Sequence, residues 1–121
     1  MITRATVYAV RMCCHIAEKG ETASSVICAA TNVPPSYGLK VLQALSRGGV
    51  LAATRGPRGG FALAREAEEV NLYEIVIACD GPITIGDGLP CPASDAFRIL
   101  EDGIAASLES TTLASLAAGV A

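Results

Sequence analysis

Apolar residues recur at helical spacing in the first part of the chain. Between Thr3 and Lys19 they stand three or four positions apart, which is the repeat that lines one face of a helix. The members of this stripe are Val7, Val10, Cys14 and Ala17. Gly20 is a natural end for the pattern, because glycine readily closes a helix. The sequence therefore predicts a first helix over residues 3–19.

Two further helical segments follow, separated by a short turn. Thr22 or Ala23 opens a helix that continues to Ala30, and Asn32-Val33-Pro34 is typical of a turn. Pro35 suits a first helical turn, because the N–H that proline lacks would have no partner there. The apolar residues of this third helix are Leu39, Val41, Leu42 and Leu45, before Gly48-Gly49 ends it. Two helices joined by so short a turn outline a helix-turn-helix.

The pattern then changes from helical to extended. Residues 50–54 and 61–63 form two short extended runs around Arg55-Gly56-Pro57-Arg58-Gly59-Gly60. This arrangement predicts a two-stranded hairpin whose tip is rich in glycine and carries two arginines. Beside a helix-turn-helix, such a hairpin is the wing of a winged helix. The alternative is a solvated hairpin whose glycines only make the turn.

A fourth helix is expected soon after the hairpin. Asn71 followed by Glu74 has the spacing of an N-terminal cap and a carboxylate, so the helix is predicted from Leu72 to about Cys79. Gly81-Pro82 ends it.

A long helix is then expected from about Pro92 to Ser110, and Thr112 can cap a last short helix to Leu116. The long helix has one narrow apolar stripe, formed by Phe97, Leu100, Ile104 and Leu108. A stripe this narrow is typical of a seam between two helices. The seam lies either between two subunits or within one chain.

Composition agrees with one compact, mainly α-helical domain. The chain has 121 residues, of which 51% are hydrophobic and 17% charged, which excludes disorder. Aromatic residues make up only 4%, so the core must come from small aliphatic side chains that suit closely packed helices. Arg4, Arg11 and Lys19 interrupt any signal-peptide core, and no stretch reaches about 18 apolar residues. We therefore expect no membrane span and a cytoplasmic location.

The charges are divided along the chain. The formal net charge is -3, but residues 22–65 contain no Asp or Glu and carry +5, while the remainder carries -8. The basic residues of this segment are Lys40, Arg47, Arg55, Arg58 and Arg65. Such a division favours one surface for a polyanion and another for a different partner, although chance clustering of solvated charges is the alternative.

The sequence resembles the IscR/NsrR/CymR family of bacterial winged-helix transcription regulators over nearly its whole length. The most specific element is the wing motif R-G-P-x-G-G-[FY]-x-L at residues 55–63. Four other segments match in order and spacing, namely residues 3–10, residues 33–37 leading to Leu42, residues 72–75 with 79–82, and residues 112–116.

The resemblance implies a homodimer that binds a palindromic operator, with the third helix in the major groove and the wing in the minor groove. Carried over by position, Ser36 and Tyr37 would contact DNA and Arg55 would enter the minor groove. Chemistry adds Lys40, Arg58 and Arg4 as phosphate or groove contacts, with a solvated surface charge as the alternative for Arg4. The long helix, with its stripe from Phe97 to Leu108, would form the dimer interface.

Two residues depart from the family pattern. Arg58 replaces the glycine usual at that wing position, which adds attraction to the DNA backbone or minor groove. Leu39 stands where many relatives have a Glu that can read cytosine, and a leucine cannot accept that hydrogen bond. We expect residues 1–66 to form the DNA-binding domain. Residues 67–121 form the helical dimerisation and sensor region, packed as one compact unit with the first.

The family's iron–sulfur site is not reproduced. Relatives with a cluster place three cysteines in the loop before the long helix, whereas this chain has only Cys91 there. A cluster usually needs four ligands, mostly thiolates. The cofactor is therefore left open between none and a remade site that recruits Asp87, His15 or a cysteine of the partner subunit.

Cys91 is the sensor candidate among the five cysteines. With Pro92 at the first helical position, Cys91 would lie near the helix N-cap, where the dipole stabilises a thiolate. An inert cysteine in a shortened loop is the alternative. Cys28 and Cys79 occupy apolar helix positions and are expected in the core. Cys13 and Cys14 are too close along the chain to pair with each other, although one could meet a cysteine of the other subunit.

These observations predict a regulator rather than an enzyme, because no nucleophile and base pair, phosphate loop or metal-ligand spacing is visible. We expect a homodimeric, sequence-specific DNA-binding repressor that responds to a redox, iron–sulfur or thiol signal. The alternatives are a dimeric winged-helix interaction protein and a regulator that responds to a small molecule without a cluster.

Overall fold

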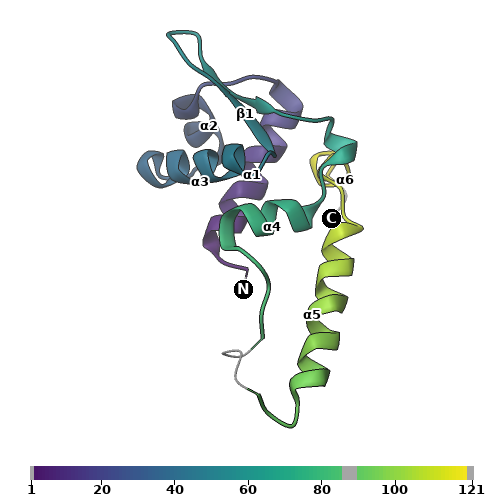
Figure 1. Cartoon of the computed structure of the whole chain (residues 1–121). Helices are drawn as coiled ribbons and strands as arrows, with labels where there is room; N and C mark the ends of the chain where they lie inside the picture. The colour runs from purple at the N-terminus through teal and green to yellow at the C-terminus, as the bar shows by residue number, and fades with distance from the viewer. Residues whose placement is uncertain (1, 86–89, 120–121) are drawn as a thin grey trace.

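The computed structural model describes residues 2–85 and 90–119. Over these residues the chain is mainly α-helical with one two-stranded antiparallel sheet, which confirms the predicted fold class (Figure 1). The elements in chain order are α1 (Arg4–Lys19), α2 (Ser24–Thr31), α3 (Pro35–Arg47), β1 (Leu51–Thr54), β2 (Gly60–Leu63), the 3-10 helix η1 (Ala67–Glu69), α4 (Leu72–Asp80), α5 (Ser94–Glu109) and α6 (Leu113–Ala117).

Helix α1 lies at the centre of the fold, but it buries a different face from the predicted one. The Thr3 side chain accepts a hydrogen bond from the Ala5 N–H and caps the helix, and Gly20 ends it with a φ of +80°. The buried residues are Thr6, Ala9, Met12, Cys13 and Ile16, whereas Val7 is exposed. Val10, Cys14 and Ala17 of the predicted stripe are half-buried and pack against this core, so the stripe lies beside the buried face rather than at its centre. The packing of α2, α4 and α6 decides which face of α1 is fully buried.

Helices α2 and α3 form the predicted helix-turn-helix. Asn32 closes α2 in the left-handed conformation, and Val33 in the turn is buried. The core side of α3 consists of Gly38, Val41, Leu42 and Leu45. Leu39, one of the apolar residues that the sequence places on this helix, is 39% exposed, because Gly38 occupies the position that faces α2.

The hairpin is paired from Leu51 with Leu63 to Thr54 with Gly60. Thr22 does not open α2, because its backbone pairs with Phe61 along the outer edge of β2, with N···O distances of 3.1 and 2.9 Å. The part of β2 next to the wing tip is therefore hydrogen-bonded on both edges.

The C-terminal helices begin with the predicted caps. Asn71 accepts a hydrogen bond from the Glu74 N–H at 2.9 Å, and Thr112 accepts one from the Ser115 N–H at 3.1 Å. Both α4 and α6 pack against α1, and Leu113 of α6 belongs to the same buried cluster as the α1 core. Helix α5 extends away from this core beyond α4 (Figure 1).

Helix α5 starts later than predicted. Its N-cap is Ala93 and its first residue is Ser94, so Pro92 and Cys91 precede the helix. The Ser94 hydroxyl accepts a hydrogen bond from the Cys91 N–H at 2.9 Å, and the Ser94 N–H donates to the Cys91 carbonyl at 3.0 Å. This turn delays the helix by two residues. Within the described ranges, no helix has the length and apolar character needed to cross a membrane.

Candidate nucleic-acid interface

One side of α3 is open to solvent and polar. Ser36, Tyr37 and Lys40, the residues predicted to contact DNA, are all exposed there. The opposite side is held tightly against α2, because a Cβ atom at Gly38 would come within 2.4 Å of the Cys28 sulfur. The close approach of the two helices positions the exposed side of α3 rigidly.

The start of α1 adds to the same surface. The ring of Tyr37 stands edge-on to that of Tyr8, with 5.5 Å between their centroids, and the Arg11 guanidinium lies 5.7 Å from the Tyr8 ring centroid. Arg4 lines a surface hollow together with Tyr8, Pro34 and Tyr37. The structure therefore brings Arg4 beside the first turn of α3, as a phosphate contact would require.

The wing carries Arg55 and Arg58 in exposed positions at its tip. Gly56 between them has a φ of +106°, which favours glycine. Gly59 is required for space, because a Cβ atom there would approach the Thr54 carbonyl oxygen to 2.1 Å. At the end of β1, the Thr54 hydroxyl donates a hydrogen bond to Glu21 at 2.6 Å.

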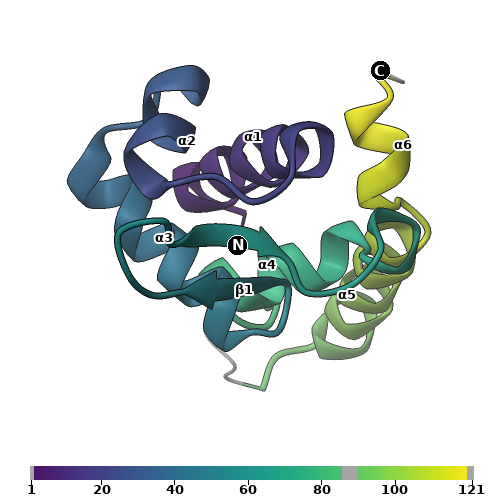
Figure 2. The same cartoon turned by 90° about the horizontal axis from the view of Figure 1, so that it is seen from above.

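The wing and the α2–α3 pair occupy one end of the molecule, and α5 and α6 occupy the other (Figures 1 and 2). The exposed side of α3 and the wing tip therefore lie on the same side of the molecule, and the start of α1 adjoins the first turn of α3. The dimer-interface candidates lie apart from them on α5. This separation agrees with two surfaces for two kinds of partner.

Arg65, the last basic residue of the positive segment, is engaged elsewhere. Its guanidinium forms a two-pronged contact with the Glu74 carboxylate, at 2.5 and 3.2 Å, and donates a third hydrogen bond to the Glu69 carbonyl. The hydrogen bonds to Glu74 raise the pKa of Arg65. Its charge is therefore compensated within the fold.

Sequence reasoning missed one exposed residue of α3. Gln43 lies one turn beyond Leu39 and Lys40, on the same open side of the helix. Its position opposite Gly38 and Leu42 becomes visible only when the buried side of α3 is known.

The predicted dimer-interface residues on α5 are largely uncovered in the single chain. Leu100 is 55% exposed and Ile104 38% exposed, while Phe97 and Leu108 are half-buried. Ile99, which the sequence analysis did not include, is 68% exposed. Ile99, Leu100 and Ile104 line one shallow apolar groove together with Gly103, Ser107 and Leu108.

The cysteines other than Cys91 lie in or beside the core, as expected for Cys28 and Cys79. Burial raises the pKa of the Cys13 thiol far above its usual range, and nearby Cys79 adds to the rise. Burial, followed by the charge of Asp80, raises the pKa of Cys79 to about 11. Burial also raises the pKa of Cys14 and Cys28. These thiols are poorly suited to form thiolates at neutral pH.

Cys91 is exposed, but it does not lie at the N-cap that the sequence predicted. The turn to Ser94 places it two residues before the cap, so the helix N–H groups do not account for its chemistry. Its sulfur instead accepts a hydrogen bond from the Ser94 hydroxyl at 3.8 Å.

The donor set does not fit an iron–sulfur cluster within one described chain. Among residues 2–85 and 90–119, no three side chains of His, Cys, Asp or Glu come together as metal ligands. His15 is half-buried on α1 and Asp87 lies outside the described residues.

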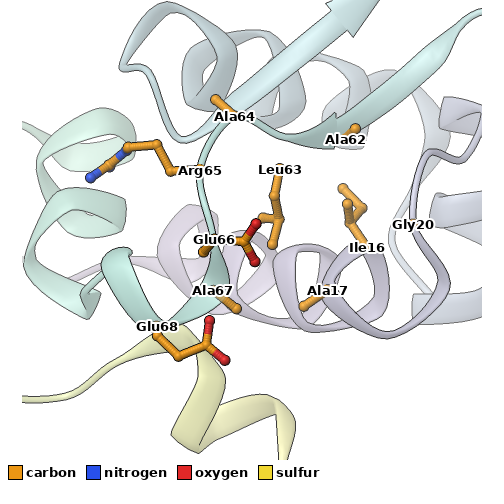
Figure 3. A pocket seen from close by; sticks show the side chains of 10 residues that line it. All are labelled: Ile16, Ala17, Gly20, Ala62, Leu63, Ala64, Arg65, Glu66, Ala67 and Glu68. Atoms are coloured by element: carbon orange, nitrogen blue, oxygen red, sulfur yellow. The ribbon is translucent and has the colours of Figure 1, made fainter.

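A separate hollow of about 460 Å³ lies beside β2 (Figure 3). Ile16 and Ala17 of α1 and Ala62 and Leu63 of β2 give it an apolar lining, whereas Glu66 and Glu68 supply carboxylates. It lies away from the exposed side of α3 and contains no cysteine.

Comparison with known proteins places this geometry among transcription regulators. A model of the Rrf2 family, described as iron-dependent transcriptional regulators, matches residues 2–119. Protein aau3 of Rhizobium meliloti is 32% identical over 102 residues, which cover 78% of this chain and 66% of that protein. The chain thus spans about two thirds of that relative's length.

Two solved structures resemble the whole chain. CymR of B. subtilis, titled its global cysteine regulator, superposes with a TM-score of 0.82 and is 25% identical, with 100% of this chain and 98% of that chain covered. The oxidized form of Staphylococcus aureus CymR gives a TM-score of 0.77 and 25% identity, with 97% and 95% covered.

Proposed function

Because the chain belongs to the Rrf2 family of transcriptional regulators, we propose that it binds double-stranded DNA as a homodimer and represses transcription from a palindromic operator in the cytoplasm. Residues 1–66 bind the DNA, and residues 67–121 supply dimerisation and sensing.

One observation carries this proposal. The exposed side of α3 and the two arginines of the wing come from separate segments, and both segments lie on the side of the molecule away from α5 and α6 (Figure 2). Arg4 lines a hollow beside the start of α3. A helix suits the major groove, and an arginine-bearing hairpin suits the narrow and electronegative minor groove. Residues 22–65, which include α3 and the wing, contain no acidic residue, and Glu21, which lies beside the wing, accepts a hydrogen bond from Thr54.

The homodimer rests on α5. Its apolar groove exposes Ile99, Leu100 and Ile104, and a second copy of α5 can cover them. Two chains joined there present two α3 helices, which is the arrangement that reads a palindrome.

Cys91 is the proposed sensor, through thiol oxidation rather than a cluster. It is exposed, and its sulfur accepts a hydrogen bond from Ser94. The similarity to a regulator solved in an oxidized form supports a redox signal.

Salt dependence tests the DNA-binding proposal. The purified chain is titrated with duplex DNA over a range of salt concentrations. Affinity is expected to fall linearly with salt on logarithmic axes, because each phosphate contact releases counterions. An affinity that does not change with salt, or no binding to any duplex, would favour an interaction protein that no longer binds DNA.

A further inference from the structure

Leu39 is an apolar side chain on the polar, open side of α3. It is 39% exposed, although the helix has Val41, Leu42 and Leu45 to pack into the core. Its neighbour Gly38 fills the core-facing position so tightly that Leu39 cannot turn inward in its place. The fold therefore holds the methyl groups of Leu39 outward between Ser36 and Gln43.

Gln43 stands one turn further along the same side. Residues four apart on a helix are neighbours, so the side chains of Leu39 and Gln43 lie next to each other. The Gln43 side chain is exposed, and within residues 2–85 and 90–119 no hydrogen bond engages its amide. Its amide therefore has a free donor and a free acceptor.

These two side chains match the major-groove edge of adenine and thymine. A glutamine amide can donate to adenine N7 and accept from adenine N6, and an aliphatic side chain can contact the C5 methyl group of thymine. Guanine and cytosine carry no methyl group in the major groove, so a leucine has no equivalent apolar contact with a G·C pair.

We infer that Leu39 and Gln43 are specificity-determining residues that select A·T and T·A base pairs in each half of the operator. The inference rests on the proposed function, with α3 in the major groove. The two residues are separated by about 6 Å along the helix, and successive base pairs by about 3.4 Å. Leu39 and Gln43 can therefore contact two adjacent base pairs, or two base pairs with one other between them.

Base analogues that each lack a single atom or group test the two contacts separately. The full chain first selects a tight-binding duplex from a randomised pool. Each thymine is then replaced by deoxyuridine, which lacks only the C5 methyl group, and each adenine by 7-deazaadenine, which lacks the N7 acceptor. Binding is followed by fluorescence anisotropy.

We expect one thymine in each half-site where loss of the methyl group weakens binding about fourfold. We also expect one nearby adenine where loss of N7 weakens binding about fivefold or more. Leu39→Ala should make binding indifferent to the uracil at that position, and Gln43→Ala should make it indifferent to 7-deazaadenine. Both residues are exposed, so both variants should keep the melting temperature of the parent chain.

Lys40→Ala is the matched control on the same helix turn. It should weaken binding to every duplex by a similar factor and keep the sensitivity to both analogues, because a phosphate contact carries no base information. A selected duplex with G·C pairs throughout the α3 contact, or analogue effects that persist in Leu39→Ala and Gln43→Ala, would overturn the inference. Failure to select any duplex would instead overturn the proposed function.

Discussion

The guanidinium groups of Arg55 and Arg58 stand in solvent at the tip of the wing. No ion pair engages them within the described residues, whereas Arg65 is bound to Glu74 and Arg98 to Asp95. Arginines without a carboxylate partner are free to enter a negative groove without first losing an ion pair. The wing motif identified Arg55 from the sequence, and the chemistry of an arginine at the same glycine-rich tip added Arg58.

Arg55→Ala is expected to weaken DNA binding by about 1–3 kcal/mol, because it removes a minor-groove contact. Anisotropy titrations at fixed salt measure the change. Arg98→Ala on α5 is the matched control, since it removes the same charge from the opposite end of the molecule. Equal losses in the two variants would mean that only net charge matters and that the wing assignment is wrong.

Cys91 should react with iodoacetamide in the folded protein well before Cys13 and Cys28. Cys91 is exposed, whereas the other two are buried and burial raises the pKa of their thiols. Peptide mass spectrometry after brief native alkylation identifies the modified residue. Rapid labelling of Cys13 would contradict the packing of α1 described above. Cys91→Ser should remove the rapid reaction and leave the slow ones.

Asp80 joins the end of one helix to the start of another. Its carboxylate accepts hydrogen bonds from the Thr3 N–H at 2.9 Å and from the hydroxyls of Thr3 and Thr6, each at 2.5 Å. Burial alone would raise the pKa of Asp80, but these hydrogen bonds outweigh it and lower the pKa. A negative charge is also favourable at the start of α1, where the helix dipole is positive.

Asp80→Asn is expected to lower the free energy of unfolding at neutral pH by about 1–2 kcal/mol. Because the pKa of Asp80 is lower in the folded chain, its contribution is present above the ordinary aspartate pKa of about 3.9 and is lost as the pH falls through the folded value. Urea denaturation across this pH range should show the two proteins converging in acid. Asp102→Asn, an exposed acid on α5, serves as the control. A gap that widened in acid would contradict the account.

The elements were predictable from the sequence to the extent that their ends are local. Thr3, Asn71 and Thr112 cap helices through hydrogen bonds to residues two or three positions away, so the sequence alone contains the signal. The buried face of α1 was not predictable, because its burial depends on where α2, α4 and α6 pack. Helix α5 starts later than predicted because Ser94 forms a turn with Cys91, although Pro92 suits a first helical position.

The same limit applies to the candidate site. The residues at the start of α3 and at the wing tip belong to recognisable motifs. Gln43 and the outward position of Leu39 depend on the contact of Gly38 with Cys28, which joins two helices. When the contact between two helices decides which side chains face outward, the sequence alone does not show the outcome.

The molecule as a whole has a polar surface on α3 and the wing and an uncovered apolar groove on α5. Figure 1 shows α3 and the wing on the side away from α5. Ile104→Glu should convert a dimer to a monomer, because it places a charge in a surface that association would bury. Light scattering or sedimentation measures the mass in solution. The affinity for the operator should fall as the dimer is lost. Val26→Glu, which changes an exposed apolar residue of α2, should keep the parent mass. A dimer that survived Ile104→Glu would place the interface elsewhere.

The strand-like pairing of Thr22 with Phe61 has a thermodynamic consequence for the wing. Since β2 is hydrogen-bonded to β1 on one edge and to Thr22 on the other, the strands up to the start of the tip lose their conformational entropy when the chain folds. Only the residues of the tip are left to be ordered when DNA arrives, which preserves binding free energy that a loose hairpin would lose. The amide protons of Thr22 and Phe61 should therefore exchange slowly with or without DNA, whereas that of Arg58 should become protected only in the complex.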